Sequence, residues 1–261
     1  MNAERVTLET LRDLADATIR SAAERPGSVD FWRKPLLVSA RADDRFSLLK
    51  KIAAHDHLLP GELLESVKSV IVFFIPFRKF LQEENSVGKF PCRNWGLAYQ
   101  ETNPLIGEVS IRIRSFLETA GYGSALTPAT HNFDPVALRA RWSHKHLGYI
   151  AGLGRFGINA QLITPSGCAG RLGSLVTEAD LGDHPLVESG ELCLHKQGKE
   201  CLRCLTRCPV SALGVDGIDR KRCWTRLKVN ITSSKGLSGL EKNTHVCGKC
   251  VVGLPCSMDP V

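Results

Sequence analysis

The chain has 261 residues, of which 43% are hydrophobic and 23% charged, and its formal net charge is +7. This composition is that of an ordinary globular protein and excludes a largely disordered or low-complexity chain. The most apolar run, Val70–Phe77, is far too short to cross a bilayer, and the amphipathic N-terminus has neither signal-peptide nor twin-arginine features. We therefore expect a cytoplasmic protein with no membrane attachment.

The first 185 residues mix expected helices with expected strands. Helical periodicity covers residues 7–24, 105–120 and about 136–151. Runs rich in β-branched and apolar residues favour strands at 70–75, 161–164 and 173–177. The passage after the first helix, through Trp32 and Pro35, is rich in loop residues, and 181–185 has the composition of a linker. Residues 1–185 are therefore expected to form an α+β domain.

Ten cysteines are present, and eight of them lie between Cys193 and Cys256. In a reducing compartment such a concentration indicates metal binding rather than a disulfide framework. The other two, Cys92 and Cys168, are expected to be small apolar residues without a ligand role. The sequence therefore predicts a small metal-binding domain over residues 186–261.

The spacing of these cysteines is typical of iron–sulfur proteins. Cys201-x2-Cys204-x3-Cys208-Pro209 matches the end of the bacterial ferredoxin run, in which the fourth cysteine ligates the other of two clusters. That logic divides the eight thiolates into two sets, each expected to hold one 4Fe–4S cluster. The first set is Cys193, Cys201, Cys204 and Cys256, and the second set is Cys208, Cys223, Cys247 and Cys250.

Two alternatives remain for this segment. All-cysteine zinc sites would use the same number of thiolates, although the C-x3-C-P ending and the lone Cys223 fit paired zinc knuckles poorly. Residues 186–261 also carry 12 Lys and Arg against 7 Asp and Glu, which is compatible with an RNA-binding face. Because a 4Fe–4S core bound by four thiolates has a net charge of about −2, the same basic residues could instead balance two clusters.

Gly152-Leu-Gly154-Arg-Phe-Gly157 matches the G-x-G-x-x-G pattern of dinucleotide-binding proteins. That fingerprint requires a strand before the glycines and a helix after them. Here a helical stretch comes first and an extended one follows, so no helix N-terminus is presented to a phosphate. The glycines are expected instead to permit a tight turn or the close approach of a flat ligand.

The block Trp142–Pro165, the segment Gly170–Thr177 and the order of the eight cysteines together resemble the epoxyqueuosine reductase family, which is similar in turn to the reductive dehalogenases. The resemblance implies a nitroreductase-like α+β domain that binds cobalamin, residues 1–185, followed by a ferredoxin-like domain with two 4Fe–4S clusters, residues 186–261. In that family, electrons pass through the clusters to cobalamin, whose Co(I) state attacks or reduces the substrate.

The resemblance also implies site residues. The expected cobalamin contacts are His144, Gly152, Gly154, Gly157 and Asn159. His144 and His146 could cap the cofactor pocket or donate a proton, and ordinary packing histidines are the alternative. The family's catalytic aspartate precedes the helix that leads into the glycine turn, which makes Asp134 the candidate proton donor here, with His131 nearby.

Three departures from the family affect the expected substrate. The helical-repeat domain that follows the clusters in the tRNA-acting enzymes is absent from these 261 residues. The last cysteine motif, Cys250-x5-Cys256-Ser257, is wider and lacks the family's proline. The position of the catalytic acid is also not matched in an ungapped register. These departures argue against tRNA as substrate and favour a short paralogue.

The leading hypothesis is a cytoplasmic reductase that receives electrons from a ferredoxin or flavodoxin. It would pass them through two 4Fe–4S clusters to a cobalamin-type cofactor and a small or nucleoside-like substrate. One alternative is a non-enzymatic electron carrier or a reductive activator of a corrinoid protein or metalloprotein. Another is a zinc-stabilised module that binds RNA. An acidic side chain placed to act on a substrate in the pocket would distinguish the reductase from the electron carrier. The metal content of the protein would decide whether it is a zinc module.

Overall fold

The computed structural model describes residues 6–130 and 132–259, so His131 lies outside the described residues. The chain divides into two compact units. The first comprises the residues up to Ile75, Pro104–Leu153 and Arg171–Glu188, and the second comprises Pro76–Asn103, Gly154–Gly170 and the residues from Ser189 onward. The second unit is thus larger than the expected domain 186–261, because two earlier segments pack with the cysteine-rich part.

The first unit is built around a four-stranded sheet with the strand order β1-β2-β8-β3. β1 (Leu36–Arg41) pairs antiparallel with β2 (Ser69–Pro76), and β3 (Ser124–Leu126) pairs antiparallel with β8 (Gly170–Thr177). All 8 residues of β2 are buried, which explains why its sequence is continuously apolar rather than alternating. The strands expected at 70–75 and 173–177 are confirmed, whereas β1, which begins directly after the loop-rich passage, was not expected from the sequence.

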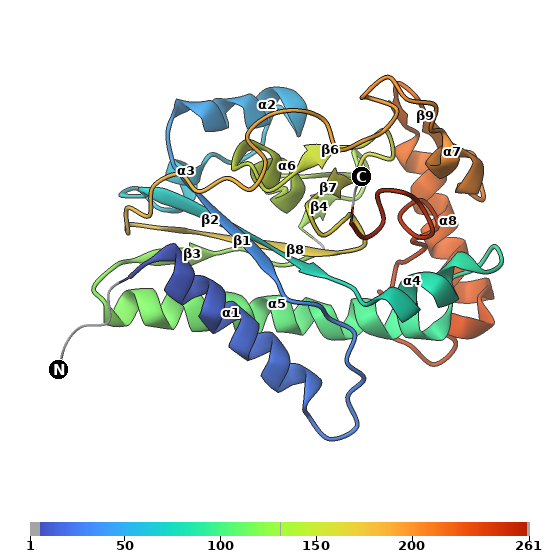
Figure 1. Cartoon of the computed structure of the whole chain (residues 1–261), viewed down its shortest axis with the longest axis horizontal. Helices are drawn as coiled ribbons and strands as arrows, with labels where there is room; N and C mark the ends of the chain where they lie inside the picture. Colours follow the sequence, from blue (N-terminus) through green and yellow to red (C-terminus); the bar gives the residue numbers. More distant parts are fainter. Residues whose placement is uncertain (1–5, 131, 260–261) are drawn as a thin grey trace. The chain divides into compact units, whose positions relative to one another are not determined.

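Helices cover both faces of this sheet (Figure 1). α1 (Leu8–Ala23) and the C-terminal part of α5 (Arg93–Thr119) lie on one face, and α2 (Leu49–Ile52) and α6 (His144–Ile150) lie on the other. The short elements η1 (Asp44–Leu48) and α3 (Pro60–Leu63) complete this side of the chain. Gly173 of β8 permits the approach of α5, because a Cβ there would lie 2.8 Å from the Ile106 side chain.

α1 confirms the helix expected at 7–24, and Thr7 caps it by accepting a 3.1 Å hydrogen bond from the Thr10 N–H. α5 confirms the helix expected at 105–120, but it begins at Arg93 and runs through Pro104. Trp95, Ala98 and Thr102 are buried in the second unit, and this burial stabilises the early turns that the proline alone would disfavour.

The helix expected at 136–151 is wrong over its first half. Residues there form a short hairpin of β4 (Phe133–Asp134) and β5 (Arg139–Ala140), and helix begins only at His144. The Asp134 Oδ1 accepts the backbone N–H groups of Val136 at 2.8 Å and Ala137 at 2.6 Å, and Leu138 has a positive φ of 54°. An aspartate that binds the next N–H groups in this way favours a turn over a helix.

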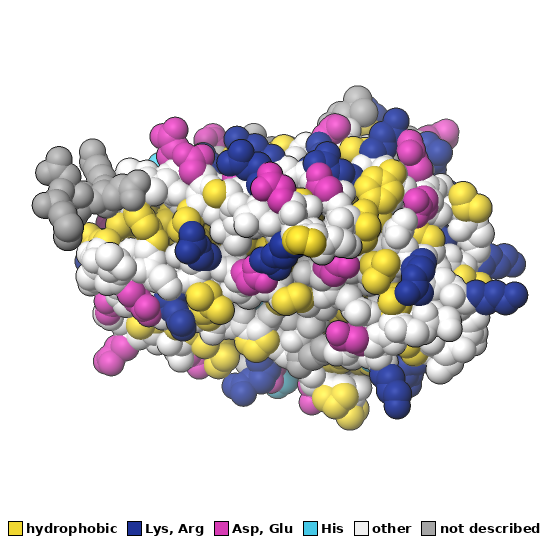
Figure 2. Space-filling model, turned by 90° about the horizontal axis from the view of Figure 1, so that it is seen from below, with side chains coloured by type: hydrophobic (Ala, Val, Ile, Leu, Met, Phe, Trp, Pro, Cys, Tyr) yellow, Lys and Arg dark blue, Asp and Glu magenta, His cyan; other side chains and the backbone are white. Residues whose placement is uncertain are grey.

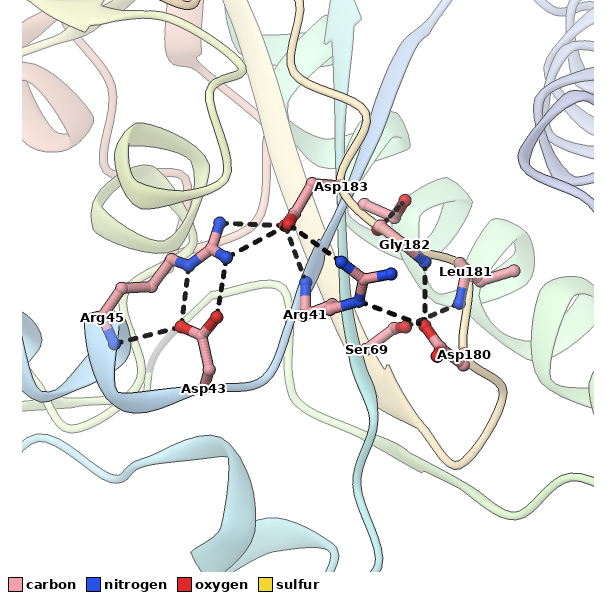
Figure 3. Close-up of polar contacts among 9 residues, drawn as sticks. Arg41, Asp43, Arg45, Ser69, Asp180, Leu181, Gly182 and Asp183 are labelled. Carbon is pink, nitrogen blue, oxygen red and sulfur yellow. Dashed lines mark hydrogen bonds and ion pairs between the residues drawn. The ribbon is translucent and has the colours of Figure 1, made fainter.

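An ion-pair network fastens the loop after β8 to the end of β1 (Figure 3). The Arg45 guanidinium donates to both Asp43 and Asp183, at distances of 2.6 to 3.1 Å. Asp183 also accepts the Arg41 N–H at 3.0 Å, and the Arg41 guanidinium lies 3.7 Å from Asp180. The shared carboxylate of Asp183 therefore connects three segments of the first unit.

The second unit contains short elements joined by long loops. They are α4 (Lys79–Ser86), the N-terminal turns of α5, β6 (Arg155–Phe156), β7 (Leu162–Ile163), α7 (Arg203–Arg207), β9 (Leu213–Gly214), β10 (Gly217–Ile218), α8 (Arg220–Ser233) and η2 (Lys235–Leu237). β6 and β7 form one antiparallel pair, and β9 and β10 form another. The strand expected at 161–164 is confirmed as β7. The glycine pattern is preceded by a helix and followed by a strand, as the sequence predicts.

No helix in the described part of the chain has the length and apolarity needed to cross a membrane. On the face drawn in Figure 2, basic and acidic side chains are interspersed among apolar ones. The net charge of +7 is therefore not gathered into one basic patch on this face.

Candidate metal centres

The first cysteine set surrounds one cavity of the second unit. The cavity is lined by Cys193, Cys201, Cys204 and Cys256. Cys204 lies on α7, Cys193 and Cys201 precede that helix, and Cys256 comes from the C-terminal segment. The rest of the lining is mostly apolar side chains and backbone. Four thiols that are separated by up to 63 positions in the sequence are thus brought to one enclosed space.

The thiols of this set affect one another electrostatically. Burial, with the neighbouring charges of Cys256 and Cys193, raises the pKa of Cys204 to about 11. Several thiolates in one buried space repel each other, and a bound metal centre with positive charge removes that penalty. The donor set therefore fits a thiolate-ligated cluster.

The second cysteine set is also gathered within the second unit. Burial raises the pKa of Cys250, and the charges of Cys247, Cys223 and Cys208 raise it further, in that order, before a smaller contribution from Cys204. Cys208 follows α7 and Cys223 lies on α8. The Ala212 N–H donates a 3.2 Å hydrogen bond to the Cys208 sulfur. Hydrogen bonds of this kind stabilise thiolates that ligate iron–sulfur clusters.

Among residues 6–130 and 132–259, no three His, Cys, Asp or Glu side chains are grouped so that they could hold a metal ion. The first set is brought together as the lining of one cavity, and the second as a group of thiols that influence each other's charge. Ligation by the eight cysteines stays a prediction.

Cys168, expected to be a plain apolar residue, is buried beside the first set. Its N–H donates a 3.0 Å hydrogen bond to the Cys256 carbonyl, and the Asn159 amide contacts its sulfur at 3.9 Å. A hydrogen bond to Cys256, together with burial, raises the pKa of the Cys168 thiol, and the same bond lowers the pKa of Cys256. Cys168 therefore acts as a thiol donor toward a predicted cluster ligand.

The residues expected to contact cobalamin have other partners. His144 and Gly152 belong to the first unit, whereas Gly154, Gly157 and Asn159 belong to the second. A Cβ on Gly152 would meet Pro185, one on Gly154 would meet the backbone of Ile163, and one on Gly157 would lie 2.7 Å from Asn159. The glycines thus give room to neighbouring protein atoms, and the role of the five residues as cobalamin contacts stays a prediction.

Asn159 has a different position from the one expected. Its side chain is 1% exposed, and its amide donates to the Cys250 carbonyl at 3.0 Å while its oxygen accepts the Gln161 N–H at 3.2 Å. Asn159 and Gly157 also line the cavity of the first cysteine set. Asn159 therefore connects the two cysteine sets, a role that its sequence position does not reveal.

His144 is a packing residue of the first unit. The Trp142 indole N–H donates to the Ser174 hydroxyl at 2.9 Å, and His144 contacts Ser174 through Nδ1 at 2.7 Å and the Pro128 carbonyl through Nε2 at 3.1 Å. Because the carbonyl accepts only, the proton lies on Nε2, and Nδ1 accepts the Ser174 hydroxyl proton. Burial lowers the pKa of His144 to about 4, so the ring is neutral.

Asp134, the expected proton donor, is exposed at the turn between β4 and β5. Its hydrogen bonds from Ala137 and Val136 lower the pKa of the carboxyl group below its usual range. A carboxylate that is ionised at neutral pH has no proton to donate. The catalytic role stays a prediction, and this geometry disfavours it.

No protein-family model matches the sequence, and no curated protein matches it either. Solved structures do match the fold. The chain is similar to an epoxyqueuosine reductase with a TM-score of 0.56 and 14% identity, over 98% of this chain and 70% of that one. A catabolic reductive dehalogenase gives a TM-score of 0.58 and 15% identity, over 87% of this chain and 30% of the other. The fold is that of the epoxyqueuosine reductases.

The epoxyqueuosine reductase fold confirms, at the level of structure, the resemblance carried by the glycine block and the cysteine order. A further match is a reductive dehalogenase with B12-dependent dehalogenation, at a TM-score of 0.52 and 14% identity over 75% of this chain and 27% of that one. The chain therefore spans 70% of the reductase and less than a third of the dehalogenases. A mixed helix and sheet class is confirmed, and identities this low report on the fold alone.

Three buried polar residues of this epoxyqueuosine reductase fold were not foreseen. Asn85 is fully buried and binds the Cys247 carbonyl, and Lys249 is 3% exposed between two predicted ligands. His57 is buried in the first unit, where its Nε2 accepts the Ser143 N–H at 2.8 Å. Of these three residues, only the burial of Lys249 could have been expected from the sequence, because it stands between two predicted cluster ligands that are themselves expected to be buried.

Proposed function

We propose that this protein is an iron–sulfur oxidoreductase that transfers electrons through two 4Fe–4S clusters. The observation that carries the proposal is the cavity lined by Cys193, Cys201, Cys204 and Cys256, the four cysteines that ferredoxin spacing assigns to one cluster. The second unit would be the ferredoxin-like part, and the first unit the nitroreductase-like part. The fold shared with reductases and reductive dehalogenases supports a redox role.

When bound, each cluster supplies a centre that accepts and releases one electron at a time. The residues of this chain hold and tune those centres. The thiolates of the two sets are the ligands, the Ala212 N–H supports the Cys208 sulfur, and the Cys168 thiol supports Cys256. Apolar lining of the first cavity limits the access of water, which lowers the local dielectric constant and strengthens these hydrogen bonds.

A corrinoid cofactor is supported by the fold and not by the five residues that the sequence nominated. One reductive dehalogenase of this fold carries out B12-dependent dehalogenation. In this chain the nominated residues pack against protein, as described above. The proposed electron transfer therefore requires no cobalamin, and reconstitution with the cofactor measures whether this protein binds it.

The second candidate function is a non-enzymatic electron carrier or a reductive activator of a corrinoid protein or metalloprotein. It is favoured by one observation: Asp134 and His144, the groups nominated for proton transfer, are engaged within the protein. A carrier needs clusters and a docking surface but no acid next to a substrate. It would bind both clusters and show no turnover of its own.

The electron donor would be an acidic protein of the ferredoxin or flavodoxin type. α8 carries the predicted ligand Cys223 and the exposed basic residues Lys221, Arg222 and Lys228, with no acidic residue within its bounds. Charge complementarity at such a helix would steer an acidic donor toward the second cluster. Nucleic acid is the competing ligand for the same basic surface, and tRNA is disfavoured as substrate.

The deciding experiment is metal and corrinoid analysis of protein purified without oxygen. We expect a brown protein with about eight iron atoms per chain and two paramagnetic signals after reduction with dithionite. A colourless protein with about two zinc atoms would overturn the proposal in favour of a zinc module. Reconstitution with cobalamin then separates the candidates: a Co(II)/Co(I) spectrum supports the enzyme, and no corrinoid binding supports the carrier.

A further inference from the structure

Three cations of the second unit converge on the last turn of α4 and the residues just after it. Lys249 donates from Nζ to the carbonyls of Asn85 at 2.6 Å and Val87 at 2.9 Å. Arg207 donates to the Ser86 carbonyl at 2.8 Å, and Arg226 donates to the Lys89 carbonyl at 2.6 Å. We call Lys249, Arg207 and Arg226 the cation cluster.

Part of this arrangement is explained by the end of a helix. α4 ends at Ser86, where carbonyl groups lack partners within the helix and carry partial negative charge. Cations satisfy such carbonyls well. Carbonyl groups are dipoles, however, and neither they nor the Phe90 ring, whose centre lies 4.4 Å from the Arg226 guanidinium carbon, supplies a full negative charge.

The cation cluster has no acidic partner in the described part of the chain. None of its three members forms an ion pair with a described Asp or Glu side chain. Lys249 is 3% exposed, and burial of an ammonium group without a countercharge is unfavourable. Each member flanks a predicted ligand of the second cysteine set: Arg207 precedes Cys208, Arg226 lies three residues beyond Cys223, and Lys249 stands between Cys247 and Cys250. The second cysteine set is therefore the anionic group that lies next to all three cations in the sequence.

The backbone around Lys249 is held in place independently of that charge. Gly248 has a φ of 74°, and a Cβ there would collide with the Trp95 ring. Asn85 donates to the Cys247 carbonyl at 3.0 Å and accepts the Cys92 N–H at 3.1 Å. The Arg207 guanidinium also donates to the Lys249 carbonyl at 3.3 Å. The ammonium group is thus held at the carbonyls of Asn85 and Val87, while the Asn85 side chain binds the Cys247 carbonyl.

We infer that the cation cluster, with Lys249 at its centre, compensates the negative charge of the second iron–sulfur cluster and raises its reduction potential. This inference rests on the proposed function. Reduction adds one negative charge to a cluster, so a buried positive charge beside it stabilises the reduced form. The first cluster, held by the other four cysteines, lacks Lys249 as a neighbour and serves as an internal reference.

The test is a redox titration of the intact protein, followed by paramagnetic resonance, for wild type, Lys249→Met, Lys249→Gln and Lys249→Arg. We expect Met and Gln to lower the potential of the second cluster by at least a tenfold change in its reduction equilibrium, about 59 mV for a one-electron couple. Lys249→Arg, which keeps the charge, should restore most of the difference. The signal of the first cluster should not move in any variant.

Two variants guard against a purely structural effect. Lys249→Met could fail to hold the second iron–sulfur cluster. In that case Arg226→Gln removes a different member of the cation cluster, at a half-buried position three residues beyond Cys223. This variant should also lower the potential of the second iron–sulfur cluster. Lys242→Gln, which changes an exposed lysine, is the matched control. Equal potentials in wild type and the charge-removing variants, or equal shifts of both clusters, would overturn the inference. Wild type without iron would overturn the proposed function instead.

Discussion

The Cys168 N–H donates a 3.0 Å hydrogen bond to the Cys256 carbonyl, and the interaction of the two thiols raises the pKa of Cys168 and lowers the pKa of Cys256. Gly167 makes this approach possible, because a Cβ there would collide with the carbonyls of Ser257 and Met258. A cysteine outside both ligand sets is therefore the neighbour of a predicted ligand.

Replacing Cys168 should alter the first cluster and leave the second unchanged. In Cys168→Ala the Cys256 thiolate loses a donor, which makes it a stronger electron donor to iron and lowers the potential of that cluster. Cys168→Ser keeps a donor and should stay closer to wild type. The measurement is a redox titration with paramagnetic detection. An unchanged first signal in Cys168→Ala, with Cys92→Ala as control, would contradict the role of the thiol.

The division of ligands predicts two separable losses. Cys204→Ser should remove the first cluster and Cys250→Ser the second, so that each variant keeps about half of the iron and one of the two signals. Anaerobic iron and sulfide analysis with resonance spectra checks this. Loss of both signals in either variant would mean that the two sets form one cooperative folding unit and do not act as independent sites.

Acid should destabilise the first unit through its neutral histidines. The pKa of His144 is lowered to about 4 in the fold, whereas an unfolded histidine has a pKa of about 6.5. The unfolded state therefore binds more protons between these values. This pKa difference contributes roughly 3 kcal/mol to the free energy of unfolding. The contribution is fully present above about pH 6.5 and is lost as the pH falls toward 4. Burial lowers the pKa of His57 and adds a loss of the same sign.

Urea denaturation followed by tryptophan fluorescence, at a series of pH values from 7.5 down to 4.5, measures this dependence. His144→Gln cannot titrate, so its free energy of unfolding should be lower at pH 7.5 and should fall less steeply on acidification. A slope equal to that of wild type would show that His144 is not the group responsible.

The glycine pattern should be sensitive to substitution for structural reasons. Gly154→Ala places a Cβ against the carbonyl of Ile163, and overpacking against backbone typically costs about 1–3 kcal/mol or more. Gly107→Ala is the matched control, because that helical position in α5 has open space and an ordinary φ. The control should be neutral or stabilised by up to about 1 kcal/mol. Thermal unfolding of both variants distinguishes the outcomes.

The shared carboxylate of Figure 3 should contribute measurably to the stability of the first unit. Asp183→Asn removes the charge that Arg45 and Arg41 share, and we expect a loss of about 1 kcal/mol at low salt. The difference should shrink in high salt, because the network is partly exposed to solvent. Asp44→Asn, at an exposed position outside this network, should have little effect. Equal losses for the two variants would contradict the role of the network.

The sequence alone determined the features that depend on local pattern. The continuous apolar run of β2, the amphipathic face of α1 and the reversed helix and strand order around Gly152 are confirmed, because each is encoded within one segment. The division of the cysteines also came from spacing, and the structure brings the first four to one cavity. The fold family was identified from the glycine block and cysteine order and is confirmed by the solved structures.

Tertiary structure decided which polar groups are already used. Asp134 binds two N–H groups of its own turn, His144 binds Ser174 and Pro128, and Asn159 binds the carbonyl of Cys250, and none of these partners is foreseeable from spacing. The position of Lys249 between two predicted ligands indicates burial but does not reveal its partners. Only the packed chain buries it against the carbonyls of Asn85 and Val87, because burial depends on which distant segments meet.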